Sequence, residues 1–249
     1  NAFAGCTKVS EVSAPFLISE LLTENLTKLY IGNKINYLAE AILSKCSKLI
    51  ELKLPFIGVS PNEKDEYGIL GILFGTTTQT TGITQYYAID KYNKYAIPLT
   101  LKSVEVINSC NQINFGAFYG CNMLEELTIS SSVQGLGEKA LYGCNKLKKI
   151  TSRWAYPPTA YNSSTFEGVN KFACTLYVPL GSKQFYSVAS GWKEFYSPID
   201  KIQEEAPFAI TSLSIPQYGG EVTGNGLFNP DSKVTLNAIA NLGYTFKYW

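Results

Sequence analysis

Few residues of this chain have the type and spacing that catalysis requires. No histidine occurs among the 249 residues, which excludes Ser-His-Asp and Cys-His machinery and histidine-based zinc sites. Adjacent carboxylates occur at 65–66, 125–126 and 204–205. Two carboxylates can hydrolyse a glycosidic bond when a cleft holds them about 5–9 Å apart, but neighbours on one strand point to opposite faces. We therefore expect no enzymatic activity.

The six cysteines could in principle form disulfides or bind a metal ion. Four of them, Cys6, Cys46, Cys121 and Cys144, occupy the same place in a repeated motif. Stacking would make their side chains parallel, whereas a disulfide requires two cysteine side chains that point toward each other. Cys110 and Cys174 have no spacing partner, and no Cys-x-x-Cys occurs. We predict reduced, buried thiols, with no metal site and no cofactor.

The elements that must position these residues repeat along the chain. The pattern Leu-x-x-apolar-x-apolar begins at Leu26, Leu49, Leu101 and Leu124, and the step from Leu26 to Leu49 equals the step from Leu101 to Leu124. Leu147 follows at the same step, and an imperfect copy begins at Val9. The motif Ala-Phe-Tyr-Gly-Cys-Asn at 117–122 returns one step later as Ala-Leu-Tyr-Gly-Cys-Asn at 140–145, with weaker copies at 2–6 and 41–46. Two motifs with one period, inside the range of roughly 20–29 residues typical of leucine-rich repeats, predict a leucine-rich-repeat solenoid of short parallel strands plus helical or 3₁₀ segments.

Stacked turns of this kind bury the leucines from the strand side and Ala117 and Phe118 from the other side. The residues that flank the middle leucine then point outward in two columns. One column reads Glu11, Lys28, Glu51, Ser103, Glu126, Lys149, and the other reads Ser13, Tyr30, Lys53, Glu105, Thr128, Thr151. Charges largely alternate between neighbours, so they can pair along the sheet. The pattern argues against a polyanion site on this face.

One turn carries an insertion, at about 58–98, because Leu49 and Leu101 are separated by more than two of the repeat steps. It contains a threonine-rich turn at 76–81 and a tyrosine cluster. One interpretation is a β-hairpin that covers the solenoid; the other is a ligand-contacting loop, since tyrosine offers a large contact area at small entropic cost. The candidate ligand-binding residues are Tyr86, Tyr87, Tyr92, Tyr95 and Tyr30. In an extended segment Tyr86 and Tyr87 face opposite ways, so we expect one of them to pack inward.

The pattern Ala-Phe-x-Gly-Cys-x-x-Leu-x-x-Leu-x-Ile at 117–129 resembles the BspA-like leucine-rich repeat of bacterial surface proteins. The stretches at 55–58, 71–75 and 97–102 resemble a variant turn of that family, and 156–195 resembles its closing stretch. The resemblance covers roughly residues 1–202, and the copy at 41–46 departs from the pattern. It implies secretion or surface display in host-associated bacteria, where some members are adhesins.

The chain changes character after Ile202. A linker is expected at 203–207, which is charged and ends in proline. Glycine turns and alternating apolar residues at 208–249 are similar to the divergent internalin B-repeat-like module and predict a small all-β unit. We expect this module to be incomplete at Trp249.

Composition narrows the possible partners. Charged residues make up only 16% and the formal net charge is +1, so no long-range field attracts nucleic acid. No apolar run approaches the length of a membrane-spanning helix, which predicts no membrane insertion within this fragment. The resulting hypothesis is a non-catalytic protein, extracellular or anchored at the cell surface, that adheres to a host or bacterial surface protein or glycan. The alternative is a purely structural display or spacer element of a larger surface protein.

Overall fold

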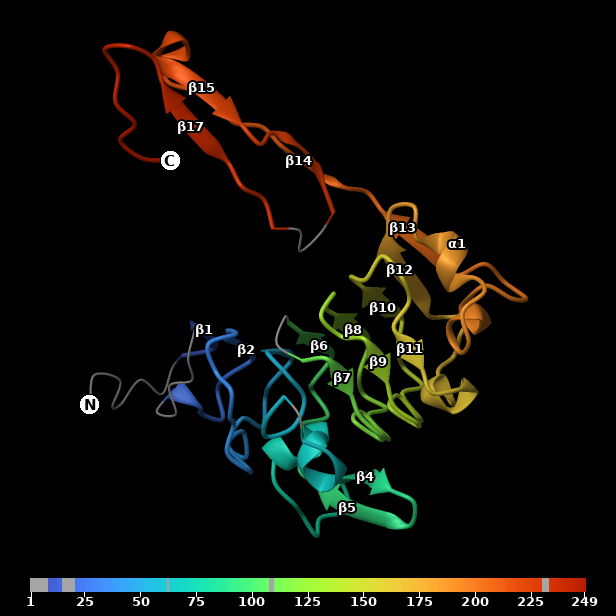
Figure 1. The fold of residues 1–249 in the computed structure, drawn as a ribbon. Helices are drawn as coiled ribbons and strands as arrows, with labels where there is room; N and C mark the ends of the chain where they lie inside the picture. The colour runs from blue at the N-terminus through green and yellow to red at the C-terminus, as the bar shows by residue number, and fades with distance from the viewer. Residues whose placement is uncertain (1–8, 15–20, 62, 108–109, 230–232) are drawn as a thin grey trace.

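A computed structural model describes residues 9–14, 21–61, 63–107, 110–229 and 233–249. Its main body is a parallel eight-stranded sheet in the order β1-β2-β3-β6-β8-β10-β12-β13 (Figure 1). The strands are β1 (Glu11–Ala14), β2 (Lys28–Ile31), β3 (Glu51–Leu54), β6 (Ser103–Val106), β8 (Glu126–Ile129), β10 (Lys149–Ser152), β12 (Thr175–Pro179) and β13 (Ile202–Glu205). The predicted solenoid of parallel strands is confirmed, including the imperfect copy at β1. The motif copy at 2–6, with Cys6, lies outside the described residues.

Strands β2, β3 and β6 each alternate a buried and an outward-facing residue, which is the two-residue period of the sequence pattern, whereas the last three residues of β10 are all buried. The middle apolar residue of each turn, such as Leu52, Val104 and Leu127, is paired in register with the next along the sheet. These side chains are at most 2% exposed. Burying one leucine contributes roughly 1.5–3 kcal/mol, so the column of middle residues is a main source of stability.

The opposite wall of the core comes from the Ala-Phe segments. Ala117, Phe118, Ala140 and Leu141 are all completely buried, as the spacing predicts. A minor parallel sheet of β7 (Gln112–Ile113), β9 (Gly135–Leu136) and β11 (Thr159–Ala160) runs along this side. A Cβ on Gly168 would come within 2.9–3.0 Å of the Gly143 backbone, so the turns pack too closely there for a side chain.

The insertion leaves the main sheet continuous, because β3 pairs directly with β6. It contains two 3₁₀ segments, η2 (Asp65–Gly68) and η3 (Leu70–Leu73), followed by strands β4 (Ile83–Ala88) and β5 (Lys91–Tyr95). The two strands form an antiparallel hairpin at the lower edge of the solenoid in Figure 1. The predicted hairpin is therefore present.

An aromatic cluster closes the far end of the solenoid. The short helix α1 (Lys183–Tyr186) and the 3₁₀ segments η4 (Ser163–Phe166) and η5 (Trp192–Phe195) supply it. Trp192 contacts Phe166 and Tyr186 at ring-centroid distances of 4.8 and 5.2 Å, and its Nε1 donates a 2.7 Å hydrogen bond to the carbonyl of Pro158. Beyond it, the structure differs from the expected linker at 203–207. Residues up to Glu205 form β13, which hydrogen-bonds to β12 and extends the sheet.

The C-terminal segment consists of two antiparallel strand pairs (Figure 1). The first pair is β14 (Phe208–Ile210) with β16 (Gly226–Phe228), and the second is β15 (Gly220–Thr223) with β17 (Asn237–Ala240), preceded by η6 (Gln217–Gly219). The predicted small β-module is confirmed. None of the described residues from 208 onward is buried, so this module has no hydrophobic core of its own.

Candidate functional site

The hairpin lies directly on the loops of the neighbouring turn. A Cβ added to Gly116 would lie 1.8 Å from the carbonyl oxygen of Tyr86, and one on Gly120 would lie 2.7 Å from that of Thr84. Both glycines also have positive φ, at 62° and 69°, a region that favours glycine. The backbone of β4 therefore approaches the solenoid as closely as a regular turn would.

Gln85 fixes the hairpin in this position. Its side chain is completely buried. Its Oε1 accepts a 2.6 Å hydrogen bond from the backbone N–H of Gly71, and its Nε2 donates to the carbonyl of Tyr119 at 3.1 Å. In the next turn, the carbonyl of Tyr142 accepts from the backbone N–H of Gly120. The side-chain amide of Gln85 thus replaces a backbone donor that a regular turn would have supplied.

Four tyrosine rings form a continuous row along this side of the molecule. The centroids of Tyr92 and Tyr86 are 4.9 Å apart, those of Tyr86 and Tyr119 are 4.9 Å apart, and those of Tyr119 and Tyr142 are 4.6 Å apart. These distances match the spacing of neighbouring strands, about 4.7–4.9 Å. Tyr119 and Tyr142 were not among the sequence candidates, although their shared place in the repeated Tyr-Gly-Cys motif was a usable signal. We call these four residues the tyrosine row.

The predicted hairpin tyrosines do not act as one group. Tyr92 is 55% exposed and Tyr86 is half-buried, so these two share an exposed surface. Tyr87 is partly buried and packs against the core, as expected for one of the pair 86–87. Tyr95 is completely buried, since its ring packs over Gly71, where a Cβ would lie 2.4 Å from it. Tyr95 is thus a core residue, which removes it from the ligand-binding candidates.

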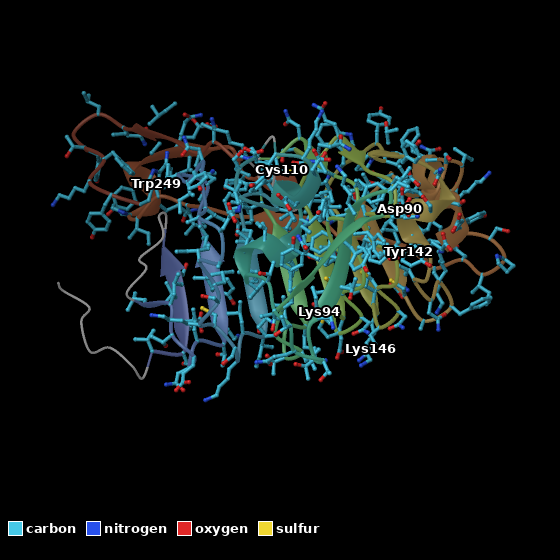
Figure 2. The ribbon with its side chains drawn as sticks, turned by 90° about the horizontal axis from the view of Figure 1, so that it is seen from below. Asp90, Lys94, Cys110, Tyr142, Lys146 and Trp249 are labelled. Atoms are coloured by element: carbon cyan, nitrogen blue, oxygen red, sulfur yellow. The ribbon has the colours of Figure 1, made fainter. Side chains whose placement is uncertain are left out.

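Within the tyrosine row, Tyr92 is exposed, whereas Tyr86, Tyr119 and Tyr142 are half-buried. Tyr119 and Tyr142 are stacked with an interplanar angle of 14°, so their facing surfaces are occupied by each other. Within the described chain, the four hydroxyls make no hydrogen bond. Burial, followed by the neighbouring Tyr142, raises the pKa of Tyr119 above the ordinary tyrosine value. In Figure 2, Tyr142 and the hairpin residue Asp90 lie on the face turned toward the viewer.

The concave sheet carries the two predicted outward columns in register, with one correction. Thr151, predicted to face outward in the second column, is only 1% exposed and is a buried residue beside its cross-strand neighbour Tyr177. Glu11 pairs with Lys28, Lys28 with Glu51, and Glu51 with Ser103 in neighbouring strands. Lys28 Nζ lies 3.0 Å from Glu51, and Lys53 Nζ lies 2.9 Å from Glu105. The predicted alternation of charge therefore produces cross-strand ion pairs on a solvated face.

Tyr30, the fifth sequence candidate, lies on this concave face and far along the chain from the hairpin. Its hydroxyl donates a 2.8 Å hydrogen bond to Glu51. This bond, followed by the ion pair with Lys28, lowers the pKa of Glu51. Tyr30 borders a shallow hollow of about 460 Å³ between β1 and β6. The structure thus divides the candidates between two surfaces, whereas the sequence pointed only to the insertion as a distinctive patch.

Known families account for both parts of the chain. The sequence matches the BspA type leucine rich repeat region in six copies, over residues 1–60 and 88–174. The chain belongs to the BspA-type leucine-rich-repeat family. Residues 211–249 match the divergent InlB B-repeat domain. No curated protein matches the sequence.

The two family matches indicate the general class of function of the BspA-type chain. Leucine-rich repeats of this kind are typically non-enzymatic, and both domain types are typical of surface or secreted proteins with protein-binding roles. In the described part of the chain, no helix has the length and apolar character needed to cross a membrane. The same residues contain no group of three or more His, Cys, Asp or Glu placed to hold a metal ion.

The cysteines of the BspA-type turns are interior residues. Cys121 and Cys144 are completely buried free thiols, as predicted, and Cys144 Sγ donates to the carbonyl of Phe118 at 3.2 Å. Burial raises the pKa of Cys121 to about 12 and that of Cys46 to about 11. Since the thiolate is the reactive form, these thiols have the properties of packing residues.

Proposed function

We propose that this chain is a non-catalytic binding protein, secreted or displayed at the cell surface, that adheres to a host protein or glycan. The tyrosine row supports this proposal most strongly. It places four aromatic rings on one rigid surface, beside the inserted turn that departs from the repeat. Tyrosine is enriched in recognition surfaces because it brings much contact area with few rotatable bonds.

The arrangement of the tyrosine row favours a role in ligand recognition over a role in covering an apolar edge of the solenoid. Covering an apolar edge requires buried rings, and Tyr95 and Tyr87 already serve that purpose. Tyr92 adds little burial, since more than half of its surface is exposed. Its position beside Tyr86 instead extends the row outward. Because Gln85 ties β4 to the solenoid, the row is held in place before any ligand arrives, which reduces the entropic cost of binding.

A display role is the second candidate. It is supported by the C-terminal β-module, whose strand pairs follow the solenoid without forming a shared core with it (Figure 1). It is also supported by the ion-paired concave face, which offers no strong field to a partner. Under this hypothesis the solenoid holds another domain away from the cell surface, and the tyrosine row has no ligand.

A binding screen of the purified chain against immobilised host matrix proteins and a glycan array tests the two hypotheses. For any ligand found, replacing Tyr86 and Tyr92 with Ala should weaken binding at least about tenfold, with little change in melting temperature. The matched control replaces Tyr218 and Tyr248, which are 71% and 81% exposed in the β-module. Equal losses in both double variants, or no ligand in the whole screen, would favour the display role.

A further inference from the structure

The hollow on the concave face is a second surface, separate from the tyrosine row. It exists because two outward positions carry small side chains. Ser13 is the cross-strand neighbour of Tyr30, and Ser103 is the neighbour of Glu51. The larger Tyr30, Lys53 and Glu105 stand around the resulting space of about 460 Å³. This volume is within the range of small-molecule sites, roughly 300–1,000 Å³.

The charges of the hollow are balanced by pairing within the protein. Glu51 is paired with Lys28, and Glu105 is paired with Lys53. An ionic ligand would have to compete with these internal partners, while a neutral ligand would not. The charge distribution therefore selects against anionic and cationic ligands.

The paired groups retain hydrogen-bonding capacity. A carboxylate can accept about four hydrogen bonds, and Glu51 uses two, from Tyr30 and Lys28. A lysine ammonium has three donors, and Lys53 uses one toward Glu105. The hydroxyls of Ser13 and Ser103 can each donate and accept. The hollow thus offers donors and acceptors side by side, which suits a ligand whose own groups do both.

An aromatic ring completes the hollow. The hydroxyl of Tyr30 on β2 donates to Glu51 on the neighbouring strand β3, so the side chain extends toward β3. Ile107, which is half-buried, adds apolar surface at one border. The arrangement combines one flat apolar wall with a rim of mixed donors and acceptors.

We propose that this hollow binds a short neutral saccharide. Sugar hydroxyls both donate and accept, carry no charge, and leave C–H-rich ring faces that can pack on Tyr30. Adjacent hydroxyls of one sugar ring would bridge Glu51 and Lys53, which leaves both ion pairs intact. The inference deepens the proposed binding function by naming a ligand class, but it concerns a different surface from the tyrosine row.

A peptide is the less suitable occupant. Extended peptides gain affinity by hydrogen-bonding their main chain to an open sheet edge. The hollow lies on the face of the sheet, and of the strands that line it β2, β3 and β6 are paired on both sides, while only β1, which contributes Ser13, is an edge strand. A peptide would therefore contact mainly side chains there. Because the charges of the hollow are already paired, they would attract charged peptide residues only weakly.

The test titrates the full chain with cellohexaose, maltohexaose and chitohexaose, followed by calorimetry and NMR. At least one should bind and shift resonances of Tyr30 and Ser103. Tyr30→Ala should weaken binding at least about tenfold. Ser103→Trp, which fills the hollow and removes no existing contact of Tyr30, should abolish it. The matched control is Tyr177→Ala, since Tyr177 is in the same outward column on β12, where Lys149 covers its ring at 4.9 Å.

The possible outcomes separate this inference from the proposed function. Absence of binding by all three neutral hexasaccharides overturns the inference, as does tighter, salt-sensitive binding of a charged oligogalacturonate. Saccharide binding that survives Ser103→Trp and is lost with the Tyr86 and Tyr92 double variant also overturns it, while it supports the tyrosine row. Loss with Ser103→Trp and retention with Tyr177→Ala support the hollow. Circular dichroism of every variant confirms that the chain remains folded.

Discussion

Replacing Gln85 with Leu should detach the hairpin from the solenoid. Leucine fills a similar space but offers neither the acceptor nor the donor of the amide. The backbone N–H of Gly71 would then lose its 2.6 Å partner, and the carbonyl of Tyr119 would lose its 3.1 Å partner. Because Gln85 is completely buried, water cannot readily replace both bonds.

The size of the effect follows from the two groups left unpaired. A buried donor or acceptor without a partner costs about 1–3 kcal/mol. The Gly71 group is buried, while the contact with Tyr119 is only partly buried, so the sum is about 2–4 kcal/mol. For a chain of this size, where about 1 kcal/mol shifts the melting temperature by roughly 2–4 °C, the expected fall is about 5–15 °C.

Urea unfolding and hydrogen exchange together measure this effect. The amide of Gly71 should lose its protection in Gln85→Leu, even if the main sheet stays folded, because a segment can open locally. Gln203→Leu on β13 is the matched control, since that glutamine is exposed and should shift stability by less than about 0.5 kcal/mol. If Gln85→Leu matches this control and Gly71 stays protected, the anchoring role assigned to Gln85 is wrong.

Three further predictions concern the thiols, the glycines and the concave face. Cys121, whose pKa burial raises to about 12, should not react with a thiol reagent at pH 8 until the chain is unfolded; prompt labelling of the native protein would contradict its packing. Gly120→Ala should be more destabilising than Gly181→Ala in thermal unfolding. Both have positive φ, which costs an alanine about 1–2 kcal/mol, but only the Cβ at Gly120 meets a neighbouring carbonyl, at 2.7 Å. Tyr30→Phe should raise the pKa of Glu51 by NMR titration, since its hydroxyl is the main cause of the lowered value. The lowered pKa stabilises the fold above the unfolded pKa of Glu51, and this contribution is lost as the pH falls through the folded pKa, so the variant should lose less stability in acid.

The repeating part of the fold could be predicted from the sequence because one signal was present several times. The leucine pattern and the Ala-Phe pattern share one period, so each turn determines the partner of the next. The register of Glu11, Lys28 and Glu51 then followed from counting alone. By contrast, β12 and β13 lack a full Leu-x-x-Leu-x-Leu pattern. They pair beside the aromatic cluster around Trp192, whose parts are distant in the chain.

The candidate site was harder to predict because it joins segments with no common pattern. Composition singled out the tyrosines of the insertion, but not the partners Tyr119 and Tyr142 on which the row depends. Tyr95 looked equivalent to Tyr92, and its burial is decided by Gly71, which lies well before it in the chain. The hollow beside Tyr30 was hidden for a similar reason. It is created by two small residues, Ser13 and Ser103, and no sequence pattern marks an outward-facing serine as part of a hollow.

The two interpretations of the hairpin are compatible, because the residues of β4 and β5 that cover the core differ from those proposed to contact a ligand. The inserted turn must complete the core and the hydrogen-bonding of its neighbour, and it does so with Tyr95, with Gln85 and with the Leu70 N–H that bonds to the carbonyl of Ala117. Strand alternation sends the adjacent residues outward, and Tyr86 there meets the ring of Tyr119. A regular turn would fix its outward residues by the repeat. The inserted hairpin is free of that constraint, so its exposed side carries residues outside the repeat pattern while its buried side keeps the solenoid continuous. The proposed binding role of the tyrosine row therefore places no demand on the residues that keep the core closed at the inserted turn.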